Sequence, residues 1–223
     1  MYKILFIDEQ EDDIDDFKDY IQKTNTKQTF ELVIELPLDS LDSMLDRILD
    51  INPDAVIVDF MLNEYKELVQ YNVPYNGVDL IEALLSIRQD FPCFVMTSFD
   101  DDAIKIIDDV NKVYIKDILH GKEKETNAKA NFLERIESQI GHYKTRIGNA
   151  EQRLEELIEM RKAGKVTMED EKEIIDLDDF LEKSLDKKSS IPEEYKTLSN
   201  TKKLEEILTK VDELLEKVNK DGK

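Results

Sequence analysis

The segment Ala55-Val56-Ile57-Val58-Asp59 contains four apolar residues in a row and ends in an aspartate. A short, continuous apolar run of this kind is typical of a β-strand that is covered on both faces, as in a parallel sheet. Four more short segments are rich in Val, Ile, Leu or Phe: Lys3–Ile7, Phe30–Ile34, Phe94–Thr97 and Val113–Ile115. We therefore predict five strands in the first half of the chain.

Segments with the apolar spacing of helices separate these strands. They are Asp13–Lys23, Leu41–Asp50, Val78–Arg88 and Asp101–Asp109. Strands that alternate with helices favour an α/β fold built on a doubly wound parallel sheet. Ligands bind at the carboxyl ends of the strands in such sheets, so the residues at those ends are the first candidates for chemistry.

The second half of the chain has the pattern of long helices. Apolar residues in Phe132–Leu157 recur in steps of three and four, close to the 3.5-residue repeat of a coiled coil. Ala163–Lys165 predicts the end of this helix, and Thr167, with an aspartate three residues later, predicts the capped start of another. We expect a first domain over residues 1–122, and a helical hairpin or coiled-coil-like region in residues 123–223 that packs within one chain or between two.

The charge of the chain excludes several classes of function. Of its 223 residues, 52 are acidic and 31 are basic, which gives a net charge of −21. Binding to nucleic acid requires Lys or Arg side chains on several phosphates, and no basic stripe supplies them. No apolar stretch approaches the roughly 18 residues of a membrane helix. The N-terminus lacks the pattern of a signal peptide, and the single cysteine, Cys93, cannot form an internal disulfide. We expect a cytoplasmic protein that binds neither nucleic acid nor membranes.

Polar side chains follow four of the five predicted strands. They are Asp8, Glu9, Asp59, Thr97, Ser98 and Lys116. At one edge of a parallel sheet, three carboxylates in a partly dry pocket would repel one another strongly. Mg²⁺ relieves that repulsion, because it binds carboxylates together with water and phosphate oxygens. A carboxylate beside Mg²⁺ can attack phosphorus and form an aspartyl phosphate, with Thr97 and Lys116 donating to the phosphoryl oxygens.

Four short motifs in this order resemble the response-regulator receiver family of two-component signalling. They are Lys3–Glu9, Ala55–Asp59, Val95–Ser98 and Tyr114–Lys116, and the resemblance covers about residues 1–122. It implies a five-stranded, flavodoxin-like sheet in which a histidine kinase, a phosphotransfer protein or a small phosphodonor phosphorylates Asp59. The implied Mg²⁺ ligands are Asp8, Glu9, Asp59 and the main-chain carbonyl of Met61. Thr97 would follow the phosphoryl group and Lys116 would contact it.

The implied function is that of a phosphorelay response regulator. Its helical C-terminal region would signal through contacts with a downstream protein, or with a second copy of the chain in a homodimer. Phosphorylation would shift an equilibrium between two states of the protein.

The sequence departs from the family's pattern near the site. Glu9 stands where receivers often have a second aspartate, and Asp117 stands where they usually have a proline. Val113 occupies the usual position of the switch aromatic, and Tyr114 is the nearest aromatic residue. Residues 61–76 form an insertion between Asp59 and the glycine that follows the phosphorylation loop. These departures leave the usual aromatic coupling open.

Other interpretations of the same residues remain. The chain could be a pseudo-receiver, a scaffold that works without phosphorylation. A Mg²⁺-dependent phosphotransferase or phosphatase would have a second aspartate two residues after the nucleophile, where this chain has Met61. We therefore expect no enzymatic activity beyond hydrolysis of the protein's own aspartyl phosphate. At single positions, Asp8 and Glu9 could belong to a solvated acidic run, Thr97 could cap a helix, and Lys116 could balance surface carboxylates.

Overall fold

The computed structural model describes residues 1–63, 67–98, 113–116, 119 and 131–185. The predicted helix Asp101–Asp109 and the residue Asp117 lie outside the described residues. The elements, in chain order, are β1 (Tyr2–Ile7), α1 (Glu11–Thr24), β2 (Phe30–Glu35), α2 (Leu41–Ile51), β3 (Ala55–Asp59), α3 (Gly77–Ile87), β4 (Cys93–Thr97), β5 (Val113–Ile115), α5 (Phe132–Lys162) and α6 (Met168–Leu185).

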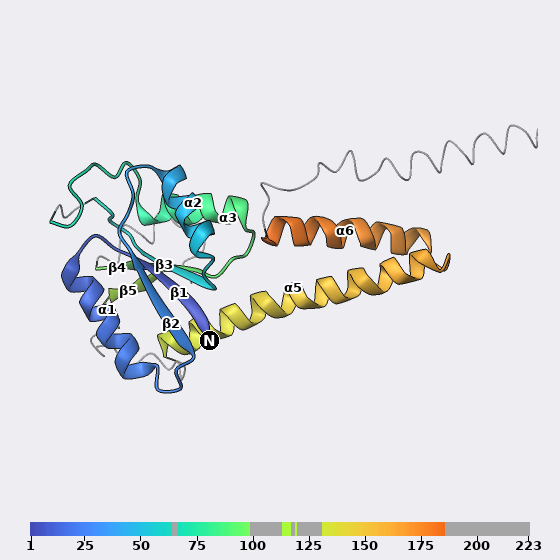
Figure 1. Ribbon diagram of the computed structural model, residues 1–223, viewed down its shortest axis with the longest axis horizontal. Helices are drawn as coiled ribbons and strands as arrows, with labels where there is room; N and C mark the ends of the chain where they lie inside the picture. The colour runs from blue at the N-terminus through green and yellow to red at the C-terminus, as the bar shows by residue number, and fades with distance from the viewer. Residues whose placement is uncertain (64–66, 99–112, 117–118, 120–130, 186–223) are drawn as a thin grey trace, which may run out of the picture. The chain divides into compact units, whose positions relative to one another are not determined.

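The strands form one parallel sheet in the order β2-β1-β3-β4-β5 (Figure 1). The chain moves outward from β1 to β2, and then returns to the other side of β1 to build β3, β4 and β5. The direction in which strands are added to the sheet therefore reverses between β1 and β3. This reversal creates the crevice at which sheets of this class bind their ligands. The expected α/β class with a parallel sheet is confirmed.

Both faces of the sheet are covered, which explains the continuous apolar runs. One face packs its side chains against α2 and α3; the strand residues involved are Leu5, Ile7, Val56, Val58, Cys93 and Val95. The other face packs against α1 and the start of α5; its strand residues are Ile4, Phe6, Phe30, Ala55, Ile57, Phe94 and Met96. Alternate residues of β1, β3 and β4 therefore enter different cores.

The chain divides into two compact units, Met1–Asn149 and Ala150–Lys223, with the boundary inside α5. The apolar residues that recur along α5 are consequently divided between the cores of the two units. Phe132, Ile136 and Ile140 are buried in the core of the first unit. Leu157 is buried in the second unit. The division at residue 122 that the sequence suggested remains a prediction.

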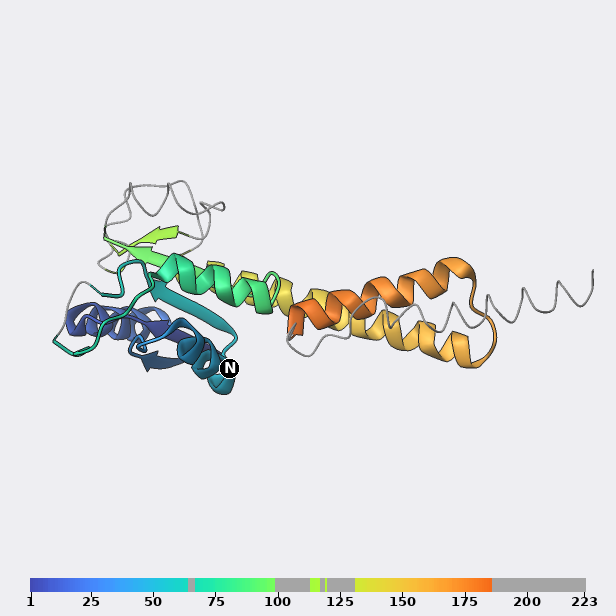
Figure 2. The ribbon, with the colours of Figure 1, turned by 90° about the horizontal axis from the view of Figure 1, so that it is seen from above.

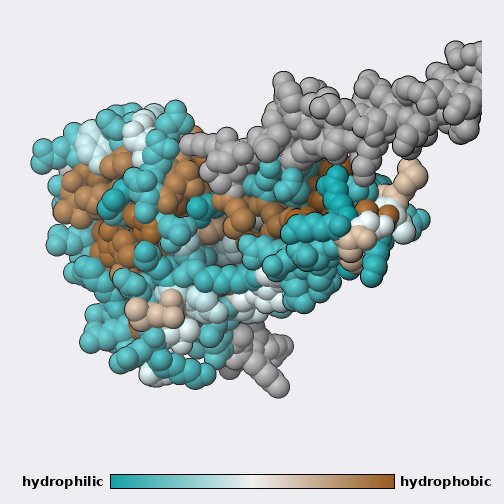
Figure 3. Space-filling view, turned by 45° about the vertical axis from the view of Figure 1, so that its right-hand side comes forward, coloured by the Kyte–Doolittle hydropathy of each residue, from teal (hydrophilic) through white to brown (hydrophobic). Residues whose placement is uncertain are grey.

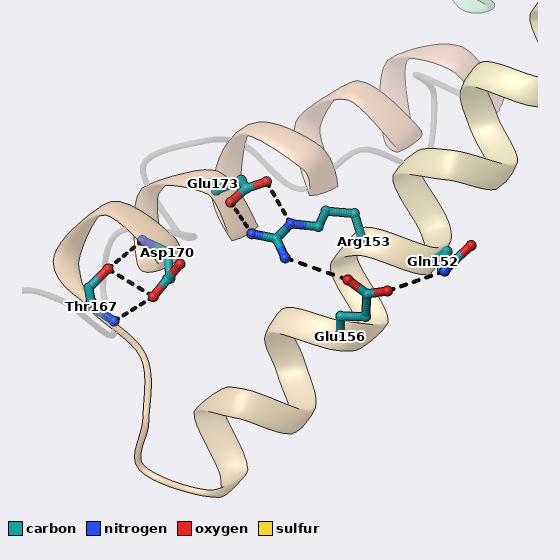
Figure 4. Close-up of polar contacts among 6 residues, drawn as sticks. All are labelled: Gln152, Arg153, Glu156, Thr167, Asp170 and Glu173. Carbon is teal, nitrogen blue, oxygen red and sulfur yellow. Dashed lines mark hydrogen bonds and ion pairs between the residues drawn. The ribbon is translucent and has the colours of Figure 1, made fainter.

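In the second unit, the end of α5 and the helix α6 run side by side in opposite directions (Figures 1 and 2). Gly164, with a φ of 68°, allows the chain to turn between them. Thr167 and Asp170 then cap the start of α6: each accepts the main-chain N–H of the other (Figure 4). The Arg153 guanidinium donates to both carboxylate oxygens of Glu173, at 2.9 Å each, and so links the two helices.

The surface of the described residues mixes hydrophobic and hydrophilic side chains. In the face drawn in Figure 3, hydrophilic residues (teal) surround smaller areas of hydrophobic ones (brown). None of the helices in the described part combines the length and the apolar composition needed to cross a lipid bilayer.

Candidate functional site

The carboxyl ends of four strands position the polar residues that the sequence singled out. Asp59 is the last residue of β3, and Asp8 directly follows Ile7, the partner of Val58 in the β1–β3 register. Thr97 ends β4, next to the residue that pairs with Asp59. Lys116 directly follows Ile115, which pairs with Thr97. The register of a parallel sheet therefore puts these residues at one edge.

The side chains of Asp8, Glu9, Asp59, Thr97 and Lys116 are buried, whereas Ser98 is exposed. The exposed fraction is 0% for Asp8 and Glu9, 3% for Asp59, 2% for Thr97 and 6% for Lys116. Asp8 and Glu9 are consequently not part of a solvated acidic surface, and Lys116 does not balance surface charges. Ionisable residues this deeply buried are uncommon unless they are paired or bind a metal.

Three carboxylates form the centre of the site. Asp8, Glu9 and Asp59 each offer one oxygen, and these oxygens lie within 4.8 Å of one another. Burial, followed by the charge of Asp59, raises the pKa of Asp8 from 3.8 to about 7. Burial is also the main reason that the pKa of Asp59 rises to about 6, in spite of the opposing effect of Lys116. The folded chain therefore holds negative charge here at a cost, and a cation would lower that cost.

Lys116 supplies positive charge to the cluster. Its Nζ lies 3.0 Å from Asp8 Oδ2 and 2.7 Å from Asp59 Oδ1. A third carboxylate, Asp13 in the first turn of α1, lies 2.5 Å from the same Nζ. Burial alone would lower the pKa of Lys116, but the carboxylates of Asp59 and Asp8 outweigh it and raise the pKa above its ordinary value. Lys116 is therefore a fixed ammonium between the cluster and α1.

Main-chain groups orient the two aspartates. The Gln10 N–H donates to Asp8 Oδ1 at 2.9 Å, and the Met61 N–H donates to Asp59 Oδ2 at 2.7 Å. Each aspartate thus has one oxygen held by the main chain and the other directed at Lys116. The Met61 main chain lies beside the cluster, while its side chain is exposed. The predicted role of the Met61 carbonyl as a metal ligand stays a prediction.

The donor set fits Mg²⁺. Hard carboxylate oxygens are the ligands that this ion selects, and one or two of them with water and phosphate oxygens complete its shell. Three carboxylates against one ammonium leave the centre with excess negative charge when all are ionised. Asp8, Glu9 and Asp59 are the residues that would hold the ion.

The insertion after Asp59 is packed against the domain. Leu62, Val69, Val73 and Tyr75 are buried in the core next to α2 and α3. The hydroxyl of Tyr75 donates to the carbonyl of Leu38 at 2.9 Å, and burial raises the pKa of that hydroxyl above its ordinary value. The hydroxyl of Tyr71 donates to the carbonyl of Pro37 at 2.7 Å. Residues at both ends of the insertion are therefore anchored to the domain.

Sequence reasoning missed Asp13 and left the role of Tyr114 open. Asp13 lies in an acidic run in which no local pattern distinguishes it from its neighbours. The ring of Tyr114 packs in an aromatic cluster, 4.5 Å from the ring of Phe132 and 5.8 Å from that of Phe94. The side chain of Val113 lies outside the described residues.

Comparisons with solved structures found similar chains at low sequence identity. No protein-family model matches the sequence, and a comparison with curated proteins gave no match either. A crystal structure of the anti-anti-sigma factor PhyR from Bartonella quintana shares 13% identity with this chain at a TM-score of 0.38, over 67% of this chain. This chain spans about half (51%) of the length of that protein. The signal receiver domain of NarL from Mycobacterium tuberculosis shares 16% identity at a TM-score of 0.35, over 52% of this chain and 84% of that one.

Proposed function

We propose that this chain is a cytoplasmic response regulator that accepts a phosphoryl group on Asp59 with Mg²⁺ bound by Asp8, Glu9 and Asp59. One observation carries the proposal: three buried carboxylates converge beside a buried lysine at the switch point of a parallel sheet. Structural ion pairs need no such excess of negative charge, whereas a site for a divalent cation does.

The proposed reaction is a phosphoryl transfer to a carboxylate. A carboxylate oxygen of Asp59 forms a bond to the phosphorus of the donor. The bond between phosphorus and the donor's leaving group breaks, and the leaving group keeps the electron pair; with acetyl phosphate, the products are the aspartyl phosphate and acetate. Bound Mg²⁺ would neutralise the negative charge that accumulates on the phosphoryl oxygens.

Residues of this chain supply the remaining contacts. The ammonium of Lys116, already 2.7 Å from Asp59, would donate to a phosphoryl oxygen in place of the carboxylate oxygen it now contacts. Thr97 at the end of β4 would donate its hydroxyl to another. Met61 keeps Asp59 Oδ2 in a main-chain hydrogen bond, so that Oδ1 is the oxygen facing the ammonium.

Incubation with acetyl phosphate and Mg²⁺, followed by intact mass measurement, tests this proposal. The wild-type chain is expected to gain one phosphoryl group, and Asp59→Asn is expected to gain none. Asp12→Asn is the matched control, because Asp12 is exposed on α1 and its change removes the same charge. An equal gain in Asp59→Asn, or no gain in the wild type with any donor, would refute the proposal.

The output is proposed to be a protein–protein contact of the helical region, with no enzymatic activity beyond hydrolysis of the aspartyl phosphate. Tyr114, two residues before Lys116, packs against Phe132 at the start of α5. We propose that a change at Lys116 reaches α5 through the contacts of the Tyr114 ring with Phe132 and Arg135. Solution mass with and without beryllofluoride, a phosphoryl mimic, would show whether the downstream contact is with a second copy of this chain.

A phosphorylation-independent scaffold is the second candidate. The observation that favours it is that Lys116 already bonds to both Asp8 and Asp59, which stabilises the folded site without any ligand. If this candidate is correct, Asp59→Asn and Asp59→Glu leave the solution mass and the hydrogen exchange of α5 unchanged, and beryllofluoride has no effect on the wild type.

A further inference from the structure

Asp13 contacts the site without belonging to the carboxylate centre. It lies in the first turn of α1, and its side chain is 21% exposed. The three carboxylates that gather within 4.8 Å are those of Asp8, Glu9 and Asp59. Among the described residues, the contact that links Asp13 to the centre is with Lys116, whose Nζ lies 2.5 Å away.

Lys116 and a cation compete for the same oxygens. The ammonium donates hydrogen bonds to Asp8 and Asp13, and its Nζ forms an ion pair with Asp59 Oδ1 at 2.7 Å. Two of these partners are proposed metal ligands, so a bound dication must weaken the bonds of Lys116 to both. The contact with Asp13 is the one that a cation at the centre leaves intact.

We propose that Asp13 is a positioning residue that draws Lys116 towards α1 and thereby frees the oxygens of Asp8 and Asp59 for a divalent cation. This inference rests on the proposed function, because it assumes that the centre binds Mg²⁺. Without Asp13, the ammonium bonds only to the two ligand carboxylates and competes more strongly with the ion.

A double-mutant cycle measured by calorimetric titration with Mg²⁺ tests the proposal in the full chain. Asp13→Asn is expected to weaken Mg²⁺ binding about tenfold, the scale of one charge-assisted hydrogen bond. Asp12→Asn removes the same charge from an exposed neighbour and is expected to weaken binding far less, because solvent screens it. In a Lys116→Met background, Asp13→Asn is expected to have no larger effect than Asp12→Asn.

The cycle separates positioning from simple loss of negative charge. If Asp13 acted only through its charge, its loss would matter at least as much without Lys116, because the lysine partly neutralises it in the wild type. Equal effects of Asp13→Asn in the two backgrounds would therefore overturn the proposal, and so would equal effects of Asp13→Asn and Asp12→Asn in the wild type.

A second measurement needs no metal. The ¹H–¹⁵N NMR signal of the Lys116 ammonium in the metal-free protein is expected to shift in Asp13→Asn and to stay in place in Asp12→Asn. An unchanged signal in Asp13→Asn would mean that the contact does not exist, and would overturn the inference even if the wild type binds Mg²⁺ and is phosphorylated. If the signal shifts in Asp13→Asn but the wild type binds no Mg²⁺, the proposed function is refuted, and this inference with it.

Discussion

Asp59 and Asp8 are carboxylates that the fold holds in an unfavourable environment. Their pKa values of about 6 and about 7 lie above the value of 3.8 expected in the unfolded chain. The folded protein therefore binds more protons than the unfolded chain between about pH 4 and pH 7, and these two groups make it less stable as the pH rises through that window. The cost rises through this window and is complete only above about pH 7, and a bound cation offsets it.

We predict that Asp59→Asn stabilises the metal-free protein at pH 7.5 by about 1–3 kcal/mol, because the amide resembles the protonated acid. The gain should shrink towards pH 4, where the wild-type carboxyl is itself protonated, and should vanish in saturating Mg²⁺. Urea unfolding at several pH values, with Asp12→Asn as control, measures this. A gain in stability that is independent of both pH and Mg²⁺ would mean that burial does not destabilise the ionised carboxylate of Asp59.

Most of the site residues were predictable from the sequence, and one was not. Asp8, Glu9, Asp59 and Lys116 were predictable, because each follows an apolar run and the topology brings such positions together. Asp13 was not, because it lies inside the helix α1 and does not follow an apolar strand. Its contact with Lys116 depends on where the first turn of α1 lies relative to the end of β5, for which the sequence has no local signal.

Gly77 shows how a single element constrains the site. It begins α3 behind the Asn76 capping box, and its N–H donates to the carbonyl of Phe60 at 2.9 Å. A Cβ at this position would lie 2.1 Å from the main-chain oxygen of Asp59. The close approach of α3 to the end of β3 therefore requires a residue without a side chain.

Gly77→Ala is predicted to destabilise the protein by more than about 2 kcal/mol, because the overlapping atoms belong to the main chain and cannot rotate away. It should also displace Asp59 and reduce phosphorylation. Gly148→Ala is the control: its Cβ meets nothing within 4 Å, and it should stabilise α5 by about 0.5–1 kcal/mol. Equal effects of the two substitutions in urea unfolding would contradict the described packing.

Element positions were more predictable than element ends. The strands Ala55–Asp59 and Val113–Ile115 have the bounds that their apolar runs indicated, whereas α1 begins at Glu11, two residues before its predicted start. Acidic residues in its first turn interact favourably with the helix dipole, although they break the apolar period. The apolar residues of α5 have the spacing of a coiled coil, because a helix that packs on a sheet and one that packs on another helix share the same apolar spacing.

At the scale of the whole molecule, the charge of the chain limits its partners. A net charge of −21 opposes the approach of other polyanions. The acidic residues outnumber the basic ones most strongly in the first half, where residues 1–119 contain 27 acidic and 10 basic side chains. A protein partner with a basic surface would be attracted to this half, and the attraction would weaken as salt is added.

We predict that the protein does not retard duplex DNA in a gel at about 50 mM salt, a condition that strengthens non-specific binding. The same holds for the phosphorylated protein, since the phosphoryl group adds negative charge. The matched comparison is the beryllofluoride-treated chain on the same gel. Retardation that weakens steeply with added salt would show that a basic surface exists after all and would redirect the search for an output.

The most direct test of the central claim is to locate the phosphoryl group chemically. Borohydride reduces an acyl phosphate to an alcohol, so a phosphorylated aspartate becomes homoserine, which peptide mass spectrometry identifies by position. After treatment with acetyl phosphate and Mg²⁺, we predict homoserine at position 59, and none when Mg²⁺ is removed by a chelator. Homoserine at another position, or none in the presence of Mg²⁺, would contradict the assignment of Asp59 as the phosphoacceptor.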